Sequence, residues 1–304
     1  MKSKAKKSGF SIIELLTVMS IIIILLGILV PSLGAVRKYA RVVRQKGLFH
    51  DISKCLESFS IDFDGYPDSS AGDPQGDNYC GAMKLCEALV GQDGMGFHPD
   101  SLFDDMGLSP PPDNTPLYFN RDPLTDEDEP SGQERQNLQS RKLCLEGEDV
   151  QVGSMEALYE NNVVGTTGDF EPNCPVLCDV FKRNQLQVLG RKAGMPILYY
   201  KADTSKLLHE KDQLGGPGTY NAGDNIYNYY DNYDLIILGV PWTGDEHAYE
   251  DPTNPFKDEI FFNQTRNRDI RTMDKPHNPN SYILQSAGWD GKYGTEDDIF
   301  NFDD

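Results

Sequence analysis

Three aspartates near the C-terminus have a spacing that would suit a metal-binding loop. Asp290, Asp297 and Asp298 lie in the segment 286–299, which also contains three glycines. Because glycine permits tight turns and positive φ, the three carboxylates can converge, with the Thr295 hydroxyl as a further oxygen. Hard oxygen ligands in a flexible loop suit Ca²⁺ better than Mg²⁺, although the spacing is not that of an EF-hand. The alternative is a surface loop in which the aspartates cap turns.

A further acid stands inside an apolar run near the N-terminus. Between Phe10 and Val30, Glu14 is the only ionisable side chain. A helix of this length measures about 31 Å, which is enough to span the hydrocarbon core of a bilayer. An ionisable group inside such a span predicts a functional role, and its partner would come from another chain. The alternative is that the carboxylate reaches back to the cytoplasmic interface.

The element that carries this lone acid is predicted to be one long helix. Apolar residues recur at helical spacing beyond Val30, so the span over 10–30 continues as an amphipathic stretch over 31–64. The Gly-Tyr-Pro sequence at 65–67 is a turn signal that should end the helix. The recurring positions are Val36, Tyr39, Ala40, Val43, Leu48, Ile52, Leu56 and Phe59.

The same region also has an interpretation as a secretory signal peptide cut before Ala35. Three observations argue against it: the apolar run is longer than such signals usually have, it contains Glu14, and the helical pattern continues past the cut. Within one continuous helix, Pro31 and Gly34 would mark a kink or a local loosening.

The charge distribution predicts the orientation of the chain in a membrane. Lysines at positions 2, 4, 6 and 7 precede the apolar run, so the N-terminus should stay in the cytoplasm and residues after about 35 should be exported. Export would permit disulfides among the cysteines, and sequence alone does not choose their pairing. Free buried thiols are the alternative, and the spacings do not fit a zinc site with two CxxC pairs. The cysteines are Cys55, Cys80, Cys86, Cys144, Cys174 and Cys178.

The segment 8–16, Ser-Gly-Phe-Ser-Ile-Ile-Glu-Leu-Leu, resembles the class III signal of type IV pilins and type II secretion pseudopilins. The resemblance implies that a prepilin peptidase removes a short basic leader after Gly9 and that Phe10 is then methylated. Ser11 and Ile12 depart from the pattern, since threonine and leucine are commoner there.

Two further positions match the same family. The resemblance implies that Glu14 pairs with the free amine of a neighbouring subunit and so fixes the register of a filament. Pro31 matches the family's helix-kinking proline. Because the cut precedes the apolar run, the membrane helix would be retained in the mature protein.

The C-terminal loop is similar to the calcium loop of the major pseudopilin of type II secretion. The matching acids are Asp290, Asp297 and Asp298, and the resemblance implies backbone carbonyl ligands near Ala287 and Thr295. The head is larger than that of a typical major subunit. A large tip pseudopilin also carries an insertion, but it usually lacks the acid that Glu14 matches.

The resemblance implies an α+β, pilin-like fold in which the long N-terminal helix packs on a small antiparallel sheet, with a large insertion. The corresponding segments are a leader over 1–9, a transmembrane helix over 10–30, an amphipathic helix over 31–64, an inserted loop-rich part of the head over 65–190, and a β-rich C-terminal part over 191–304. Hydrophobic patterns and turn signals predict the shorter elements. These are helices over 83–90 (closed by Gly91), 155–161 and 257–267, strands over 195–202, 234–240, 281–287 and 299–302, an extended or turn-like segment over 109–112, and loops over 121–136 and 203–231.

Composition narrows the function. A net charge of −20 argues against nucleic acid as a partner, and the sequence contains no GxSxG, HExxH or phosphate-loop motif, so we do not expect an enzyme. The five histidines are scattered without metal-ligand spacing: His50, His98, His209, His247 and His277. The leading hypothesis is a structural subunit of a type II secretion pseudopilus or related type IV filament, in the inner membrane with a single span and a periplasmic head. Its expected partners are other pilin subunits, prepilin peptidase, the inner-membrane assembly platform and the lipid bilayer.

The second hypothesis is a membrane-anchored binding protein that uses the pilin signal only for display. The tyrosine-rich segment 220–233, with Trp242 and Trp289, could line a carbohydrate site. Ordinary core and loop packing is the commoner role of such aromatic residues.

Overall fold

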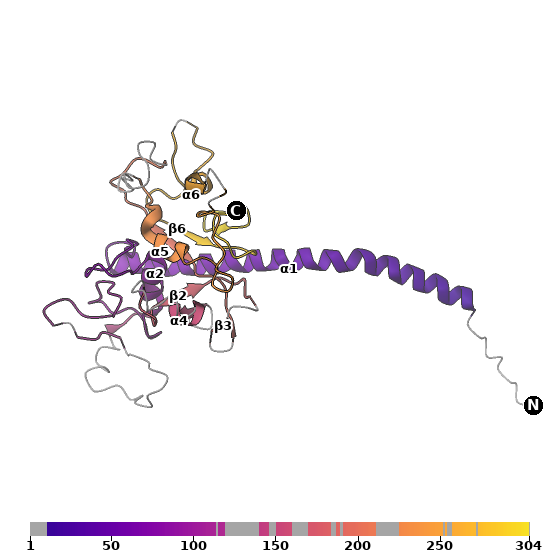
Figure 1. The fold of residues 1–304 in the computed structure, drawn as a ribbon, viewed down its shortest axis with the longest axis horizontal. Helices are drawn as coiled ribbons and strands as arrows, with labels where there is room; N and C mark the ends of the chain where they lie inside the picture. Colours follow the sequence, from indigo (N-terminus) through magenta and orange to yellow (C-terminus); the bar gives the residue numbers. More distant parts are fainter. Residues whose placement is uncertain are drawn as a thin grey trace, which may run out of the picture. The chain divides into compact units, whose positions relative to one another are not determined.

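A computed structural model provides the structure of the chain (Figure 1). It describes residues 11–113, 115–118, 140–145, 150–159, 170–183, 187–188, 191–210, 225–251, 253, 257–271 and 273–303. Internal contacts divide the chain into two compact units, Met1–Val43 and Arg44–Asp304.

Helix α1 runs from Ile12 to Asp62 and continues through Pro31 without interruption (Figure 1). Every side chain from Ile12 to Val30 is exposed, and among the described residues this is the one helix long and apolar enough to cross a membrane. Apolar side chains that the protein itself does not cover need another apolar environment, which a bilayer supplies.

The core-facing part of α1 begins later than the sequence pattern predicted. Val36, Tyr39 and Val43 are exposed, although they belong to the predicted apolar stripe. The buried side chains recur at three- and four-residue steps, as expected for one face of a helix. They are Gln45, Leu48, Phe49, Ile52, Cys55, Leu56 and Phe59. The helix ends at Asp62, and Asp64, with φ of +55°, directly precedes the turn predicted over 65–67.

Helix α2, Gly81–Val90, is buried on all sides. Ala88 packs with Phe59 of α1 and with Phe97, so α2 lies against the C-terminal part of α1. Gly91 closes the helix with φ of +80°, and its N–H donates to the Glu87 carbonyl at 2.8 Å. A Cβ at this position would collide with the Gly96 carbonyl, which explains the glycine. The predicted helix over 83–90 is confirmed.

All the named strands pair antiparallel, in three small sheets. Strand β1 (Gln151–Ser154) pairs with β2 (Pro175–Cys178), and β3 (Gln187–Val188) pairs with β4 (Arg191–Lys192). The third sheet has the order β5-β6-β7, from β5 (Leu198–Lys201), β6 (Tyr282–Ser286) and β7 (Ile299–Phe300). In its register Tyr199 faces Leu284 and Gln285 faces Phe300. The chain is therefore α+β, with a long N-terminal helix and small antiparallel sheets in place of the single sheet expected.

The strand predicted over 234–240 is wrong. The 3-10 turn η2 (Tyr229–Asn232) runs directly into helix α5 (Tyr233–Ile237). A short apolar run can form either a strand or a buried helical turn, and periodicity does not separate the two. Leu235 and Ile236 are buried while Ile237 is exposed, as a single helical turn against the core allows.

The other predicted helices are present with shorter bounds. Helix α4 spans Met155–Leu158 and α6 spans Lys257–Thr265. Residues 111–113 form a turn that follows a bend at Pro110, which agrees with the turn-like alternative predicted for the proline-rich segment 109–112. The loop predicted over 121–136 lies outside the described residues, as do residues 211–224 of the loop predicted over 203–231.

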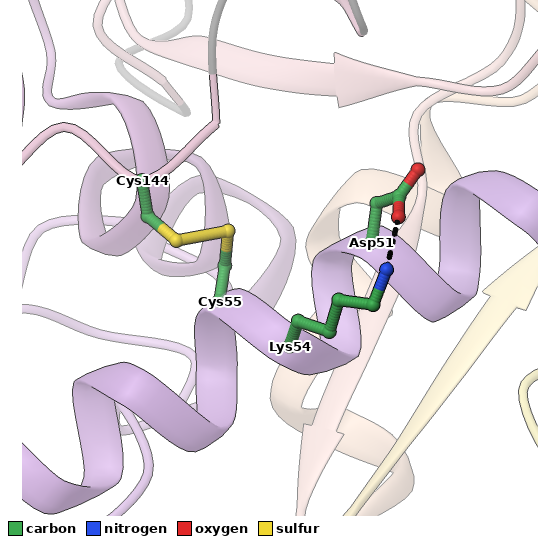
Figure 2. Close-up of a disulfide and its surroundings, with 4 residues drawn as sticks. All are labelled: Asp51, Lys54, Cys55 and Cys144. Atoms are coloured by element: carbon green, nitrogen blue, oxygen red, sulfur yellow. Dashed lines mark hydrogen bonds and ion pairs between the residues drawn. A yellow bond between two sulfur atoms is a disulfide. The ribbon is translucent and has the colours of Figure 1, made fainter.

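One disulfide joins α1 to the segment 140–145. Cys55 and Cys144 are bonded, with a Cα–Cα distance of 5.6 Å (Figure 2). An exposed ion pair lies beside Cys55 on the same helix: the Lys54 Nζ is 3.0 Å from the Asp51 Oδ1. The remaining cysteines are free thiols in buried positions: Cys80, Cys86, Cys174 and Cys178. Burial raises the pKa of the Cys80 thiol to about 11, so it is an uncharged core residue at neutral pH.

The buried carboxyl of Asp231 should make stability depend on pH. Burial raises its pKa from 3.8 to about 7, against the effect of the hydrogen bond from Ser69. The folded state therefore binds the proton more tightly, and this carboxyl costs stability progressively as pH rises from about 4 to about 7. His209 and His247 have the opposite effect on stability. Burial lowers the pKa of each imidazole and favours its neutral form, so their contribution to stability increases as pH rises.

The comparison of Asp231→Asn with the unchanged protein isolates this one group. Relative to the unchanged protein, we expect the variant to gain about 3 kcal/mol of unfolding free energy on going from pH 5 to pH 8. Urea unfolding at both pH values measures the difference. A variant whose relative stability is the same at both pH values would show that Asp231 titrates normally.

Candidate functional site

The acidic loop is built between β6 and β7 on glycines with positive φ. Gly288, Gly291 and Gly294 have φ of +60°, +81° and +88°. A Cβ on Gly288 would collide with the Asp297 carbonyl, so glycine lets the two sides of the loop approach.

Arg183 anchors the loop from outside. Its guanidinium is buried, donates to the Gly288 carbonyl at 2.7 Å and to the Phe181 carbonyl at 2.6 Å, and lies 3.7 Å from the Asp179 carboxylate. A Cβ on Gly291 would fall 2.6 Å from the Arg183 Nε, so this glycine leaves room for the guanidinium.

Asp297 organises the middle of the loop. Its Oδ2 accepts the N–H groups of Trp289 at 2.5 Å and Asp290 at 3.0 Å, and its Oδ1 accepts the Thr295 hydroxyl at 2.9 Å. The pKa of the Asp290 carboxyl is raised, first by burial and then by the Asp297 charge beside it. Two adjacent carboxylates repel each other, and a bound cation would relieve that repulsion.

Asp298 is a carboxylate of the loop that has one oxygen hydrogen-bonded and the other without a partner. Its Oδ2 accepts the Gly294 N–H at 2.7 Å and the Gln285 side-chain amide at 2.8 Å, and Gln264 of α6 lies at 3.3 Å. Its Oδ1 is buried without a hydrogen-bond partner. Burial raises the pKa of this carboxyl well above its ordinary value. A buried carboxylate oxygen that lacks a donor is costly, and it is a position that a cation can occupy.

The predicted carbonyl ligands already have protein partners. The Thr295 carbonyl accepts the Gln264 amide at 2.8 Å and the Asp298 N–H at 3.4 Å, and the Ala287 carbonyl accepts the Gly291 N–H at 3.2 Å. A carbonyl oxygen has two lone pairs, so the single hydrogen bond to Ala287 leaves a coordination position, whereas a cation at the Thr295 carbonyl would displace the long bond from the Asp298 N–H. The structure therefore brings Asp290, Asp297 and Thr295 together, with Asp298 held beside them by Gln285.

A different acidic group has its ligand atoms closer together. Among the described residues, the carboxylates of Asp73, Asp104 and Asp105 form the one set of three or more candidate ligand atoms that lie within 4.8 Å of one another. Burial and the neighbouring Asp73 charge raise the pKa of Asp105 to about 6. Asp73 accepts three backbone N–H groups, from Gln75, Gly76 and Asp77, and thus caps its own turn. Sequence reasoning missed this group, because only the Asp104–Asp105 pair is adjacent in the chain.

The N-terminal site is described from Ser11 onward, so Gly9 and Phe10 lie outside it. The Glu14 Oε2 accepts the Ser11 N–H at 2.9 Å, and the Ser11 hydroxyl oxygen accepts the Ile13 N–H at 3.3 Å. This reciprocal pattern is a variant of the capping box at the start of α1, in which the Ser11 hydroxyl accepts from the second helical residue. Glu14 thus has a local role in helix initiation that the sequence analysis did not consider.

The aromatic residues considered for a carbohydrate site are mostly packed within the protein. The Arg183 guanidinium carbon lies 5.4 Å from the centroid of the Trp242 ring. The centroid of the Tyr229 ring lies 5.6 Å from those of Tyr249 and Phe261. Trp289 is 44% exposed and touches Phe181 edge-on at 6.5 Å. Residues 220–224 lie outside the described part of the chain.

Comparisons with protein-family models, with curated proteins and with solved structures find no match. The chain is therefore α+β. Its N-terminal helix is long and apolar enough to cross a membrane, and its C-terminal loop carries several carboxylates.

Proposed function

We propose that this chain is a non-catalytic, pilin-like structural subunit of a type II secretion pseudopilus or a related type IV filament. The observation that carries the proposal is the start of α1. A fully exposed apolar surface runs from Ile12 to Val30, and it contains one carboxylate, in the first helical turn. A single-pass anchor needs no acid there, whereas a helix that leaves the bilayer to pack against copies of itself can use one.

In the proposed filament, the Glu14 carboxylate forms an ion pair with the N-terminal amine of a neighbouring subunit. The hydrogen bond to Ser11 N–H occupies Oε2. A carboxylate has about four lone-pair positions, so Oε1 is left to accept from the amine that cleavage after Gly9 would create. The exposed apolar side chains Leu33, Val36 and Tyr39 would extend the contact between packed helices beyond the pair.

This function implies the proposed location. The chain resides in the inner membrane with its N-terminus in the cytoplasm before cleavage and its head in the periplasm, then moves into the filament. Its partners are prepilin peptidase, the assembly platform and other pilin subunits. The Cys55–Cys144 disulfide is compatible with a head in an oxidising compartment.

N-terminal sequencing of the mature protein tests the processing step. In cells with prepilin peptidase we expect a chain that begins at an N-methylated Phe10. In matched cells without the peptidase we expect the uncut N-terminus. A chain that begins at Ala35 in both strains would instead identify a secretory signal peptide and remove the filament proposal.

We propose further that the loop 286–299 binds Ca²⁺. The ligands would be Asp290, Asp297 and the orphaned Oδ1 of Asp298, with carbonyls of Thr295 and Ala287. The ion would supply positive charge to acids that otherwise repel one another, and so stabilise the turn between β6 and β7.

Calcium removal should destabilise the head. At a hundredfold excess of Ca²⁺ over its Kd, binding adds about 3 kcal/mol to the free energy of unfolding, and EGTA should abolish this gain. Asp298→Asn should weaken calcium binding at least about tenfold, as measured by calorimetry. Glu296→Gln is the matched control, because Glu296 is exposed in the same loop and loses the same charge. Equal losses in both variants would point to bulk electrostatics rather than a coordinated ion.

A further inference from the structure

A polar cavity lies beside the end of β5, and filament assembly gives it no role. Its walls come from three segments that are distant in sequence, 68–70, 201–204 and 225–231. The volume is about 440 Å³, within the range of about 300–1,000 Å³ typical of small-molecule sites.

Buried polar groups form one wall of the cavity. Asp231 and Ser69 are 5% and 3% exposed, and the Ser69 hydroxyl donates to the Asp231 carboxylate. The Ser69 oxygen in turn accepts the Lys201 N–H at 3.0 Å. Asn225 is held by two hydrogen bonds to the Glu210 backbone, at 2.9 and 3.0 Å. These groups are fixed by the protein, so a ligand would meet a preorganised surface.

Charges of both signs line the cavity. Asp68 is compensated by Lys84, whose buried ammonium lies 2.8 Å from it and also donates to Ser70 and to the Gly72 carbonyl. The Asp203 carboxylate remains, together with the buried carboxyl of Asp231, which is partly protonated at neutral pH, and the Lys201 ammonium opposes them. In the described part of the chain, no carboxylate lies within ion-pair distance of Lys201.

This mixture of charges selects against ions. An anion would meet the Asp203 carboxylate and the acidic oxygens of Asp231, and a metal ion or amine would meet the Lys201 ammonium. Among the described residues that line the cavity, an apolar ligand would find only Ala202 and Ile226 as apolar partners. Neutral hydroxyl groups suit every wall, because they can donate to carboxylates and accept from Lys201 and Thr204. We propose that the cavity binds a neutral sugar unit.

Saturation-transfer NMR on the full chain, in a detergent without a sugar head group, tests the proposal. The probes are glucose, galactose, mannose and N-acetylglucosamine, with glucuronate and glucosamine as charged counterparts. We expect a Kd of about 1 mM or tighter for at least one neutral sugar, and about tenfold weaker binding of the charged forms. A tetrasaccharide that binds more tightly than its monosaccharide would identify the end of a polysaccharide as the source, and equal affinities would identify the free sugar.

Two variants assign the binding to this cavity. Lys201→Met and Thr204→Val should each weaken binding about tenfold, while Lys182→Met, an exposed lysine outside the cavity, should leave it unchanged. Thermal melting checks that each variant is folded, and either cavity variant suffices if the other does not fold. The proposal fails if no neutral sugar binds, if a charged form binds as well as the neutral one, or if folded cavity variants behave like Lys182→Met. It does not rest on filament assembly, so either idea can fail alone.

Discussion

Glu14→Gln should prevent filament assembly while leaving helix α1 and membrane insertion intact. Glutamine keeps an oxygen that can accept the Ser11 N–H, and it is favoured at this position of a capping box. It lacks the negative charge that a neighbour's amine would need. Removing one partner of a buried charge pair costs about 3–5 kcal/mol, more than about a hundredfold in an equilibrium constant. The measurement is chemical cross-linking in membranes, where a ladder of multimers should be lost.

Glu14→Ala separates the two roles of this side chain. Alanine removes both the cap and the charge, so both variants should fail to assemble if the charge matters. If Glu14→Gln assembles normally and Glu14→Ala does not, the role of Glu14 is helix capping and the intersubunit pair is wrong. Ser20→Ala is a suitable control, because Ser20 is exposed on the same apolar span and bonds only to carbonyls of its own helix.

Loss of the Cys55–Cys144 disulfide should destabilise the head by about 4–5 kcal/mol. The bond joins residues 89 positions apart, and a cross-link over so long a loop removes much of the entropy of the unfolded chain. Cys144→Ser keeps the buried Cys55 thiol and breaks only the bridge, since Cys144 is exposed. Urea unfolding of this variant, compared with the unchanged protein, measures the effect.

A second variant controls for packing at the buried end of the bridge. Cys55→Ala with Cys144→Ser should lose little beyond Cys144→Ser alone, because only one buried sulfur is removed. If the unchanged protein unfolds at the same urea concentration with and without reductant, the bridge contributes nothing to stability and this prediction is wrong.

The sequence predicted those elements whose ends are set by neighbouring residues in the chain. The end of α1 at Asp62 and the closure of α2 at Gly91 follow from turn residues and from glycine's tolerance of positive φ. Strand β6 followed from a compact β-rich run between turn signals. The glycines of the acidic loop likewise predicted tight turns with positive φ, which Gly288, Gly291 and Gly294 have.

The rest depends on partners that are distant in the chain. Strand β5 pairs with β6 across more than half of the C-terminal region, and β3 and β4 have only two residues each, too few for a periodic pattern. At the candidate metal loop, the side-chain amides of Gln264 and Gln285 donate to the Asp298 carboxylate. The sequence of the loop does not indicate that these two residues are its partners. The helical turn α5 replaced a strand because tertiary packing decides the conformation of short apolar runs.

The bond between Cys55 and Cys144 also makes the backbone between them part of a covalent ring. A protease that cuts once inside the ring leaves two pieces that are still linked through sulfur. The cut molecule keeps its mass until a reductant is added, apart from one added water. A cut outside the ring releases a fragment at once. Limited proteolysis with and without reductant therefore sorts the accessible sites of the head by their position relative to these two residues.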